Sequence, residues 1–241
     1  MIRITTLPLY YLPSPAQNSS TLHRLRPLLS LLLPLLLCTC GPAQNLETVL
    51  QTAATGSVRY HQDQQILEAS LNLSPAPAKA PSLFGTPLPT LPETGPGNYK
   101  LRKKIAFPTD FSFSLPCGKG QTTDCPLDFT FTPPFIDSLP AVMSRNTTIR
   151  FVAGEKGLSK QESLEVFFEP VNRSEPHRML VQGPTKRGTI TLPKLAMADL
   201  APGLYDVYLV KQQLNRDSTA ALQHSLQTEY FTNTRRVNVT E

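Results

Sequence analysis

The run Phe111-Ser112-Phe113-Ser114-Leu115-Pro116-Cys117 is followed after a short gap by Cys125-Pro126-Leu127-Asp128-Phe129-Thr130-Phe131. In both runs apolar and polar residues alternate, which is the period of a β-strand with one buried face. The residues between them, 118–124, include two glycines and suit a turn. We therefore predict a β-hairpin whose phenylalanines enter a hydrophobic core.

Short alternating runs of the same kind continue on both sides of this hairpin. Pro and Gly separate them, and 24 prolines in 241 residues argue against long helices. We predict an all-β chain, an antiparallel β-sandwich of about ten to eleven strands. The other predicted strands are 56–60, 66–73, 99–107, 147–152, 164–169, 178–182, 188–192, 204–212 and 226–232.

The segment Leu200-Ala201-Pro202-Gly203-Leu204-Tyr205-Asp206-Val207-Tyr208 resembles the L-x-P-G-x-Y-x-V turn and strand of bacterial immunoglobulin-like sandwiches. The resemblance implies that Pro-Gly makes the turn and that Tyr205 packs at a sandwich corner. It covers about nine residues and carries an expectation of fold, not of function.

Residues 74–97 hold seven prolines and three glycines, a composition typical of extended loops. We predict a Pro-rich loop or linker there. Within it, Leu91-Pro92-Glu93-Thr94-Gly95 resembles a sortase sorting signal. A working signal lies near the C-terminus and precedes an apolar segment, so we interpret these five residues as a coincidence.

The first forty residues contain no acidic side chain. Arg24 and Arg26 precede the apolar run 27–37, and this order of charged and apolar regions is typical of a secretory signal. The run is too short to span a bilayer, which takes roughly 20 residues. We therefore predict a signal helix that is cleaved off during export.

Two cleavage sites compete. Leu37-Cys38-Thr39-Cys40-Gly41 resembles a bacterial lipobox, which implies cleavage before Cys40 and acylation of its thiol, although Thr39 departs from the usual small residue. Gly41-Pro42-Ala43 resembles an ordinary signal-peptidase site and would leave a soluble protein. We favour the lipobox. The predicted organisation is a signal peptide (1–39), a tether (40–55), a hairpin joining the sandwich (56–73), the Pro-rich loop (74–97) and a sandwich domain (98–241).

Export places Cys117 and Cys125 in an oxidising compartment, so we predict a disulfide between them. A zinc site would need further ligands, and the nearest histidines are His61 and His177. A redox-active pair would normally be a CxxC motif, which is not present.

The net charge of +5 largely reflects the leader, because cleavage removes Arg3, Arg24 and Arg26 and leaves 20 basic against 18 acidic residues. Lys100, Arg102 and Lys104 lie on one face of a predicted strand and are candidate contacts for an anionic partner. The alternative is a charged strand face that discourages edge pairing. The cluster is short and lacks interleaved aromatics, so we expect no nucleic-acid partner.

The sequence carries no recognisable catalytic or metal-binding motif, and we expect no cofactor. The pairs Asp124 with Asp128 and Glu165 with Glu169 are interpreted as solvent-facing positions of strands. Tyrosines that could contact a sugar are Tyr60, Tyr99, Tyr205, Tyr208 and Tyr230.

These observations predict a lipid-anchored, non-catalytic protein of the cell envelope that is attached to a membrane through Cys40. Its role would be structural, or the binding of an unidentified envelope protein or glycan. One alternative is a secreted or periplasmic enzyme whose site combines His177 or His224 with a distant carboxylate. Another is a module that binds sugars or anions. The enzyme would show a histidine within hydrogen-bond reach of a carboxylate in a cleft. The binding module would show a cluster of exposed tyrosines, or of Lys100, Arg102 and Lys104, beside a concave surface.

Overall fold

The computed structural model describes residues 4–5, 51–172 and 175–241. The predicted signal peptide, its cleavage site and Cys40 therefore lie outside the described residues, apart from the two-residue strand β1 (Ile4–Thr5). Within the described part there is no α-helix, only strands and three 3₁₀ turns, η1 (Pro92–Thr94), η2 (Lys119–Gln121) and η3 (Lys194–Met197). The predicted all-β class is confirmed.

Ten strands form one large sheet. Its order is β6 (Asn98–Lys104), β3 (Ile66–Ser74), β2 (Thr52–His61), β16 (Leu222–Phe231), β15 (Gly203–Ser218), β12 (Glu162–Pro170), β13 (His177–Gln182) and β1, with β17 (Arg235–Thr240) beside β15 and β10 (Val142–Ser144) beside β17.

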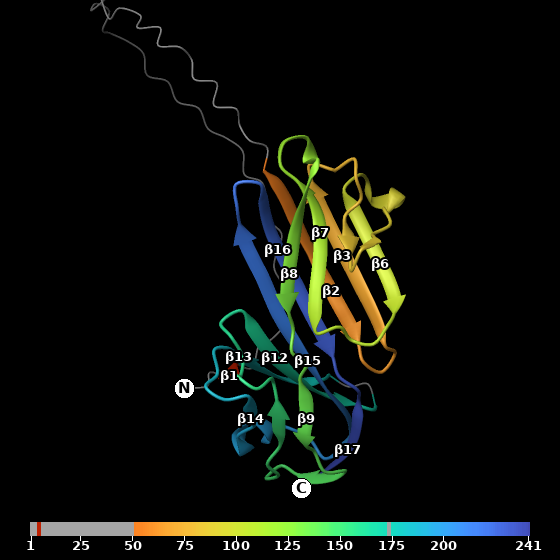
Figure 1. Ribbon diagram of the computed structural model, residues 1–241. Helices are drawn as coiled ribbons and strands as arrows, with labels where there is room; N and C mark the ends of the chain where they lie inside the picture. Colours follow the sequence, from red (N-terminus) through yellow and green to blue (C-terminus); the bar gives the residue numbers. More distant parts are fainter. Residues whose placement is uncertain (1–3, 6–50, 173–174) are drawn as a thin grey trace, which may run out of the picture. The chain divides into compact units, whose positions relative to one another are not determined.

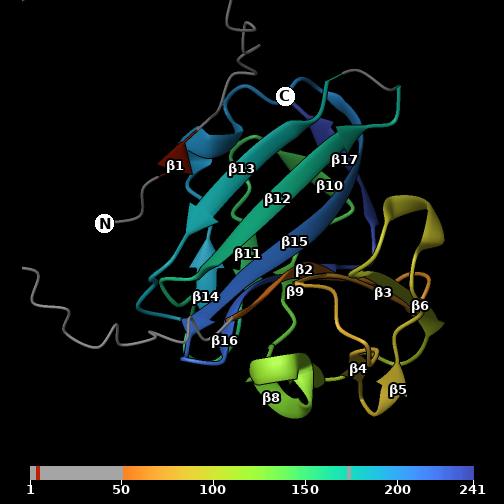
Figure 2. The same ribbon diagram turned by 90° about the horizontal axis from the view of Figure 1, so that it is seen from above.

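Two small sheets pack on one face of the large sheet, so the sandwich is confirmed. One contains β5 (Thr86–Pro87), β4 (Ser82–Leu83), β7 (Asp110–Cys117) and β8 (Thr123–Thr130); the other contains β14 (Thr189–Thr191), β11 (Arg150–Val152) and β9 (Phe135–Ser138). Figure 1 shows β7 and β8 in front of β2 and β3, and Figure 2 shows the large sheet from another side.

Each small sheet encloses its own hydrophobic core. The first core joins Phe111, Phe113 and Leu115 of β7 to residues of β2, β3 and β16, including Val58 and Leu226. The second joins apolar residues of β11, β12 and β15 and ends near the C-terminus. Strands before and after residue 98 share the first core.

The large sheet is mixed, which corrects the prediction of a purely antiparallel sandwich. β2 runs parallel to β16, with Tyr60 opposite Tyr230, and β10 runs parallel to β17. Residue alternation reports which face of a strand is buried, not the direction of the neighbouring strand. Partners about 170 residues apart could not be paired from the sequence.

The strands are also more numerous and less equal in length than predicted. The described residues hold 17 strands, and β15 alone has 16 residues. β15 pairs with β12 and β17 through its first part and with β16 through its second part, so one strand contributes to both halves of the sandwich. Figure 1 shows β15 among the strands of the large sheet, between β12 and β16.

Two predicted connecting segments are partly ordered strands. β2 begins at Thr52, inside the predicted tether, because Thr52 and Ala54 are buried against β16. The Pro-rich segment contributes β4 and β5 and buries Leu83 and Leu88 in the first core, so it is not a linker.

The predicted hairpin and its disulfide are confirmed. β7 and β8 pair in register from Asp110 opposite Thr130 to Cys117 opposite Thr123. Cys117 and Cys125 are disulfide-bonded, with Cα atoms 5.9 Å apart. The loop between them is tied to the Pro-rich segment, because the Gln121 side-chain amide donates a hydrogen bond to the Pro75 carbonyl at 2.6 Å.

A buried cation joins the two halves of the sandwich. Lys211 of β15 lies between the cores, and its side chain is 2% exposed. Its Nζ donates to the carbonyl oxygens of Thr132 (3.0 Å) and Ala153 (2.9 Å) and pairs with Glu162 Oε1 (2.8 Å). An ammonium has three donors, so all three are satisfied here. Thr132 belongs to the segment that crosses from one small sheet to the other, and Lys211 fixes that crossing to the large sheet.

Tyr205 forms the corner contact that its motif implies. Its side chain is buried, and its hydroxyl donates a hydrogen bond to the Ala201 carbonyl at 2.8 Å. The hydrogen bond thus closes the turn at residues 202–203, from which β15 begins.

Replacing Tyr205 with Phe will lower the free energy of unfolding by about 1 kcal/mol, because the hydrogen bond from the Tyr205 hydroxyl to the Ala201 carbonyl is lost. Urea denaturation measures the change. Tyr99→Phe is the matched control, since Tyr99 is equally buried and no hydrogen bond of its hydroxyl is found within the described residues. Equal effects of the two substitutions would contradict the assigned role of the Tyr205 hydroxyl.

Candidate functional site

The large sheet has one face directed away from both cores, and we call it the outer face. Because side chains alternate, the residues next to each core residue in a strand point to this face. On β15 the core positions Val207 and Leu209 alternate with Asp206, Tyr208 and Val210. Both small sheets pack on the opposite face, so the outer face is the broad surface on which a partner could bind.

A ladder of alternating charges crosses four strands of the outer face. Its members lie directly opposite one another in the order Arg102, Glu68, Arg59 and Glu229. Arg102 pairs with Glu68 at 3.1 Å, and Arg59 pairs with Glu229 at 2.7 Å. Gln227 also donates to Glu229, at 2.7 Å. Each arginine is paired with a glutamate, so the ladder adds little net charge to the outer face. Its pairs instead support the alignment of neighbouring strands.

The predicted anion contacts Lys100, Arg102 and Lys104 are exposed and share the outer face of β6, as their spacing predicted. Arg102 is already paired with Glu68. The sheet ends at β6, and part of that edge is covered by the Pro-rich segment, because the Lys100 amide donates to the Pro89 carbonyl and the Leu91 amide to the Asn98 carbonyl. The cluster thus belongs to an edge strand. Long charged side chains at such an edge also prevent another chain from pairing with it.

A second group of outer-face residues surrounds two stacked rings. Phe167 and Tyr208 stack with ring centroids 4.9 Å apart, and the Arg178 guanidinium lies 5.8 Å from the Phe167 centroid. Burial, and then the neighbouring Glu169 carboxylate, raise the pKa of the Tyr208 hydroxyl. Burial also raises the pKa of the Glu165 carboxyl, with Arg178 opposing this and Glu229 adding to it. The Glu165 and Glu169 carboxylates of β12 therefore lie on the same face as a half-buried aromatic group.

The tyrosines do not form a sugar-binding cluster. Tyr60, Tyr99, Tyr205 and Tyr230 are buried, and only Tyr208 of the five lies on the outer face. Burial raises the pKa of Tyr230 to about 12, as expected for a hydroxyl inside a core. The interpretation of these four residues as surface contacts is therefore wrong.

None of the three described histidines is hydrogen-bonded to a carboxylate within the described part of the chain. His61 stacks on Phe231 with centroids 4.5 Å apart, and His177 Nε2 lies 3.1 Å from the Ala196 carbonyl oxygen. His224 lies opposite Asp217, but the Asp217 carboxylate accepts the Ser218 amide instead. Burial lowers the pKa of His224, and Asp217 partly opposes this.

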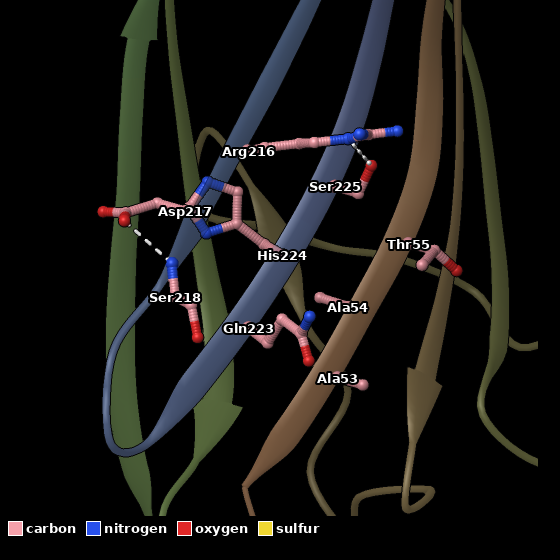
Figure 3. Close-up of a pocket in the computed structure, with 9 residues that line it drawn as sticks. All are labelled: Ala53, Ala54, Thr55, Arg216, Asp217, Ser218, Gln223, His224 and Ser225. Carbon is pink, nitrogen blue, oxygen red and sulfur yellow. Dashed lines mark hydrogen bonds between the residues drawn. The ribbon is translucent and has the colours of Figure 1, made fainter.

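A hollow of about 550 Å³ lies at the tip of the β15–β16 hairpin, beside the start of β2. It is lined by Ala53, Ala54, Thr55, Arg216, Asp217, Ser218, Gln223, His224 and Ser225. In Figure 3 the Arg216 and Ser225 side chains lie on one side of the hairpin and those of Asp217 and His224 on the other. Sequence reasoning missed this hollow, because strand pairing alone brings residues 53–55, 216–218 and 223–225 together.

Metal binding finds no support in residues 51–172 and 175–241, where no group of three or more His, Cys, Asp or Glu side chains could hold an ion. Among the described residues, no helix has the length and apolar character needed to cross a membrane. The chain matches no protein-family model, and a search of curated proteins finds no significant relative.

Proposed function

We propose that this protein is an exported, lipid-anchored component of the cell envelope that acts by binding, or as a structural part of an envelope assembly, through the outer face of its large sheet. The observation that carries the proposal is the Cys117–Cys125 disulfide of the β7–β8 hairpin. Disulfides persist in oxidising compartments. A cysteine pair in disulfide geometry therefore agrees with the signal-like leader and its lipobox-like end at Cys40.

Within this proposal we assign the sandwich to the immunoglobulin-like type. The Tyr205 hydroxyl bonded to the backbone four residues upstream supports the assignment, because a tyrosine corner of this kind recurs in immunoglobulin-like sandwiches. The parallel pairing of β2 with β16 and the second small sheet would then be additions to the common plan.

A binding or structural role is favoured over catalysis by the state of the polar side chains. The outer-face charges Arg59, Arg102, Glu68 and Glu229 are paired with each other, and each described histidine contacts a ring, a carbonyl or a strand neighbour rather than a carboxylate partner. A histidine oriented by a carboxylate is the arrangement that the alternative enzyme was expected to show. A broad face whose charges are already paired instead suits recognition of another surface.

Metabolic labelling with palmitate tests the anchor. The wild-type chain, expressed in a bacterium that processes lipoproteins, is expected to carry label in the membrane fraction, and Cys40→Ala is expected to carry none. Cys38→Ala is the matched control, two residues away, and is expected to keep the label. Absence of label from both the wild type and Cys40→Ala would overturn the lipid anchor. Loss of label only in Cys38→Ala would show that Cys38, and not Cys40, carries the lipid.

A further inference from the structure

The hollow at the hairpin tip combines small side chains with one guanidinium. Ala53, Thr55, Ser218 and Ser225 are among the residues that line it, and their side chains are short. Figure 3 shows the Arg216 side chain reaching from β15 across β16 toward β2. The Arg216 guanidinium and the hydroxyl and amide groups of Thr55, Ser225 and Gln223 thus line the same hollow.

The outer face carries no carboxylate in the three rows of residues nearest this tip. The rows of directly opposed residues are Ser218, Gln223, Ala53 and Ser74; Arg216, Ser225, Thr55, Asn72 and Asn98; and Leu214, Gln227, Ser57, Ser70 and Lys100. Asp217 points to the other face, where its Oδ1 accepts the Ser218 amide at 2.8 Å. Arg216 and Lys100 are therefore the charges of this region, and both are positive.

The guanidinium of Arg216 is held by one contact and keeps its fork available. Its Nε donates to Ser225 Oγ at 3.2 Å. Within the described residues, no hydrogen bond or ion pair engages its two terminal nitrogens. A guanidinium fork matches two oxygens of a phosphate group, and hydroxyl and amide donors around it complete such a site.

The hollow also lies where the chain enters the sandwich. Gln51 directly precedes β2, and its side-chain amide donates to Ser218 Oγ at 3.2 Å and to the Thr219 carbonyl. If Cys40 carries the lipid, residues 41–51 are the whole connection to β2. Eleven residues reach at most about 40 Å, since an extended chain spans 3.3–3.6 Å per residue. The anchor would therefore hold this end of the sandwich near the membrane surface.

We propose that the hollow binds the phosphate group of an anionic membrane lipid, with Arg216 as the ionic contact and Ser225, Thr55 and Gln223 as hydrogen-bonding neighbours. This inference rests on the proposed lipid anchor for its location. Binding would orient the sandwich, so that the β15–β16 tip faces the lipid headgroups and the β9–β11 half is presented away from them.

Vesicle co-sedimentation tests the proposal on the unlipidated chain 44–241, which contains both hydrophobic cores and the disulfide. The wild type is expected to bind vesicles that contain phosphatidylglycerol and not vesicles of phosphatidylcholine alone. Arg216→Ala is expected to reduce the partition coefficient about fivefold, the equivalent of roughly 1 kcal/mol for one arginine at an anionic surface. Arg216→Lys is expected to fall between them, because it keeps the charge and loses the fork.

Arg235→Ala is the matched control, since it removes the same charge from an exposed position on β17. Equal losses in Arg235→Ala and Arg216→Ala would show attraction to net charge only and overturn the site. Wild-type binding by Arg216→Ala, or no binding of the wild type to phosphatidylglycerol vesicles, would do the same. A larger loss in Lys100→Ala than in Arg216→Ala would mean that the main ionic contact is Lys100 on β6, and would overturn the assignment to Arg216.

Glycerol 3-phosphate distinguishes the lipid from a free phosphate ester. We expect millimolar concentrations of it to leave most of the protein on the vesicles, because the negative surface potential of the vesicle attracts this basic region in addition to the phosphate contact. Complete displacement would assign the hollow to a soluble ligand and contradict the proposal. Palmitate labelling of Arg216→Ala in cells is expected to equal that of the wild type, so failure of the site and failure of the anchor give different results.

Discussion

Lys211→Met will lower the free energy of unfolding by about 3–5 kcal/mol, the loss expected when one partner of a buried ion pair is removed. The substitution keeps most of the side-chain volume and removes the ammonium. The Glu162 carboxylate, 11% exposed, then loses its cation, and the carbonyls of Thr132 and Ala153 lose their donor. Urea denaturation followed by circular dichroism measures the change.

Lys79→Met is the control, because Lys79 also pairs with a carboxylate, Asp124, but both side chains are exposed. Exposed pairs contribute about 0–1 kcal/mol, so this variant should unfold almost like the wild type. Adding Glu162→Gln to Lys211→Met should recover part of the loss, since no buried charge then remains unpaired. A loss below about 1 kcal/mol in Lys211→Met would show that the junction does not depend on this cation.

Removal of the disulfide has the second largest expected effect. The double variant Cys117→Ala, Cys125→Ala should lose about 2.5 kcal/mol, because the bond no longer restricts the unfolded chain over the loop between the two cysteines. The loop is short, which keeps the effect below that of Lys211→Met. Thermal or urea unfolding of the oxidised wild type and the double variant gives the difference.

Reductant provides the control for this prediction. It should destabilise the wild type by a similar amount and leave the double variant unchanged. A wild type whose unfolding is the same with and without reductant would mean that the cysteines are not bonded in the folded protein, and the argument for an oxidising compartment would lose its structural support.

The sequence was most informative where the two faces of a strand differ. Phe111 and Phe113 against Ser112 and Ser114 give a strong alternation, and the hairpin they predicted is present. The period of two also placed Lys100, Arg102 and Lys104 on one face. In the second half of β15, polar residues occupy both faces, with Gln213 and Asn215 on the core side, so its end at Ser218 was missed.

Other features depend on which strands become neighbours, and one sequence does not contain that information. The hollow around Arg216 requires β2 to lie beside β16, although Ala53 and Gln223 are far apart in the chain. The burial of Lys211 was also unpredicted, because its acceptors come from Thr132, Ala153 and Glu162. A lysine directly after the apolar run 207–210 was the only local signal.

The intact mass of the protein isolated from a lipoprotein-processing bacterium tests the central claim most directly, because cleavage, acylation and the disulfide each change it. We predict the mass of residues 40–241 plus the acyl and glyceryl groups on Cys40, lighter by the two hydrogen atoms lost in the disulfide, and heavier by two after reduction. The mass of residues 44–241 without acyl groups would contradict the lipid anchor. A mass that retains residues 1–39 would contradict export by a cleaved leader.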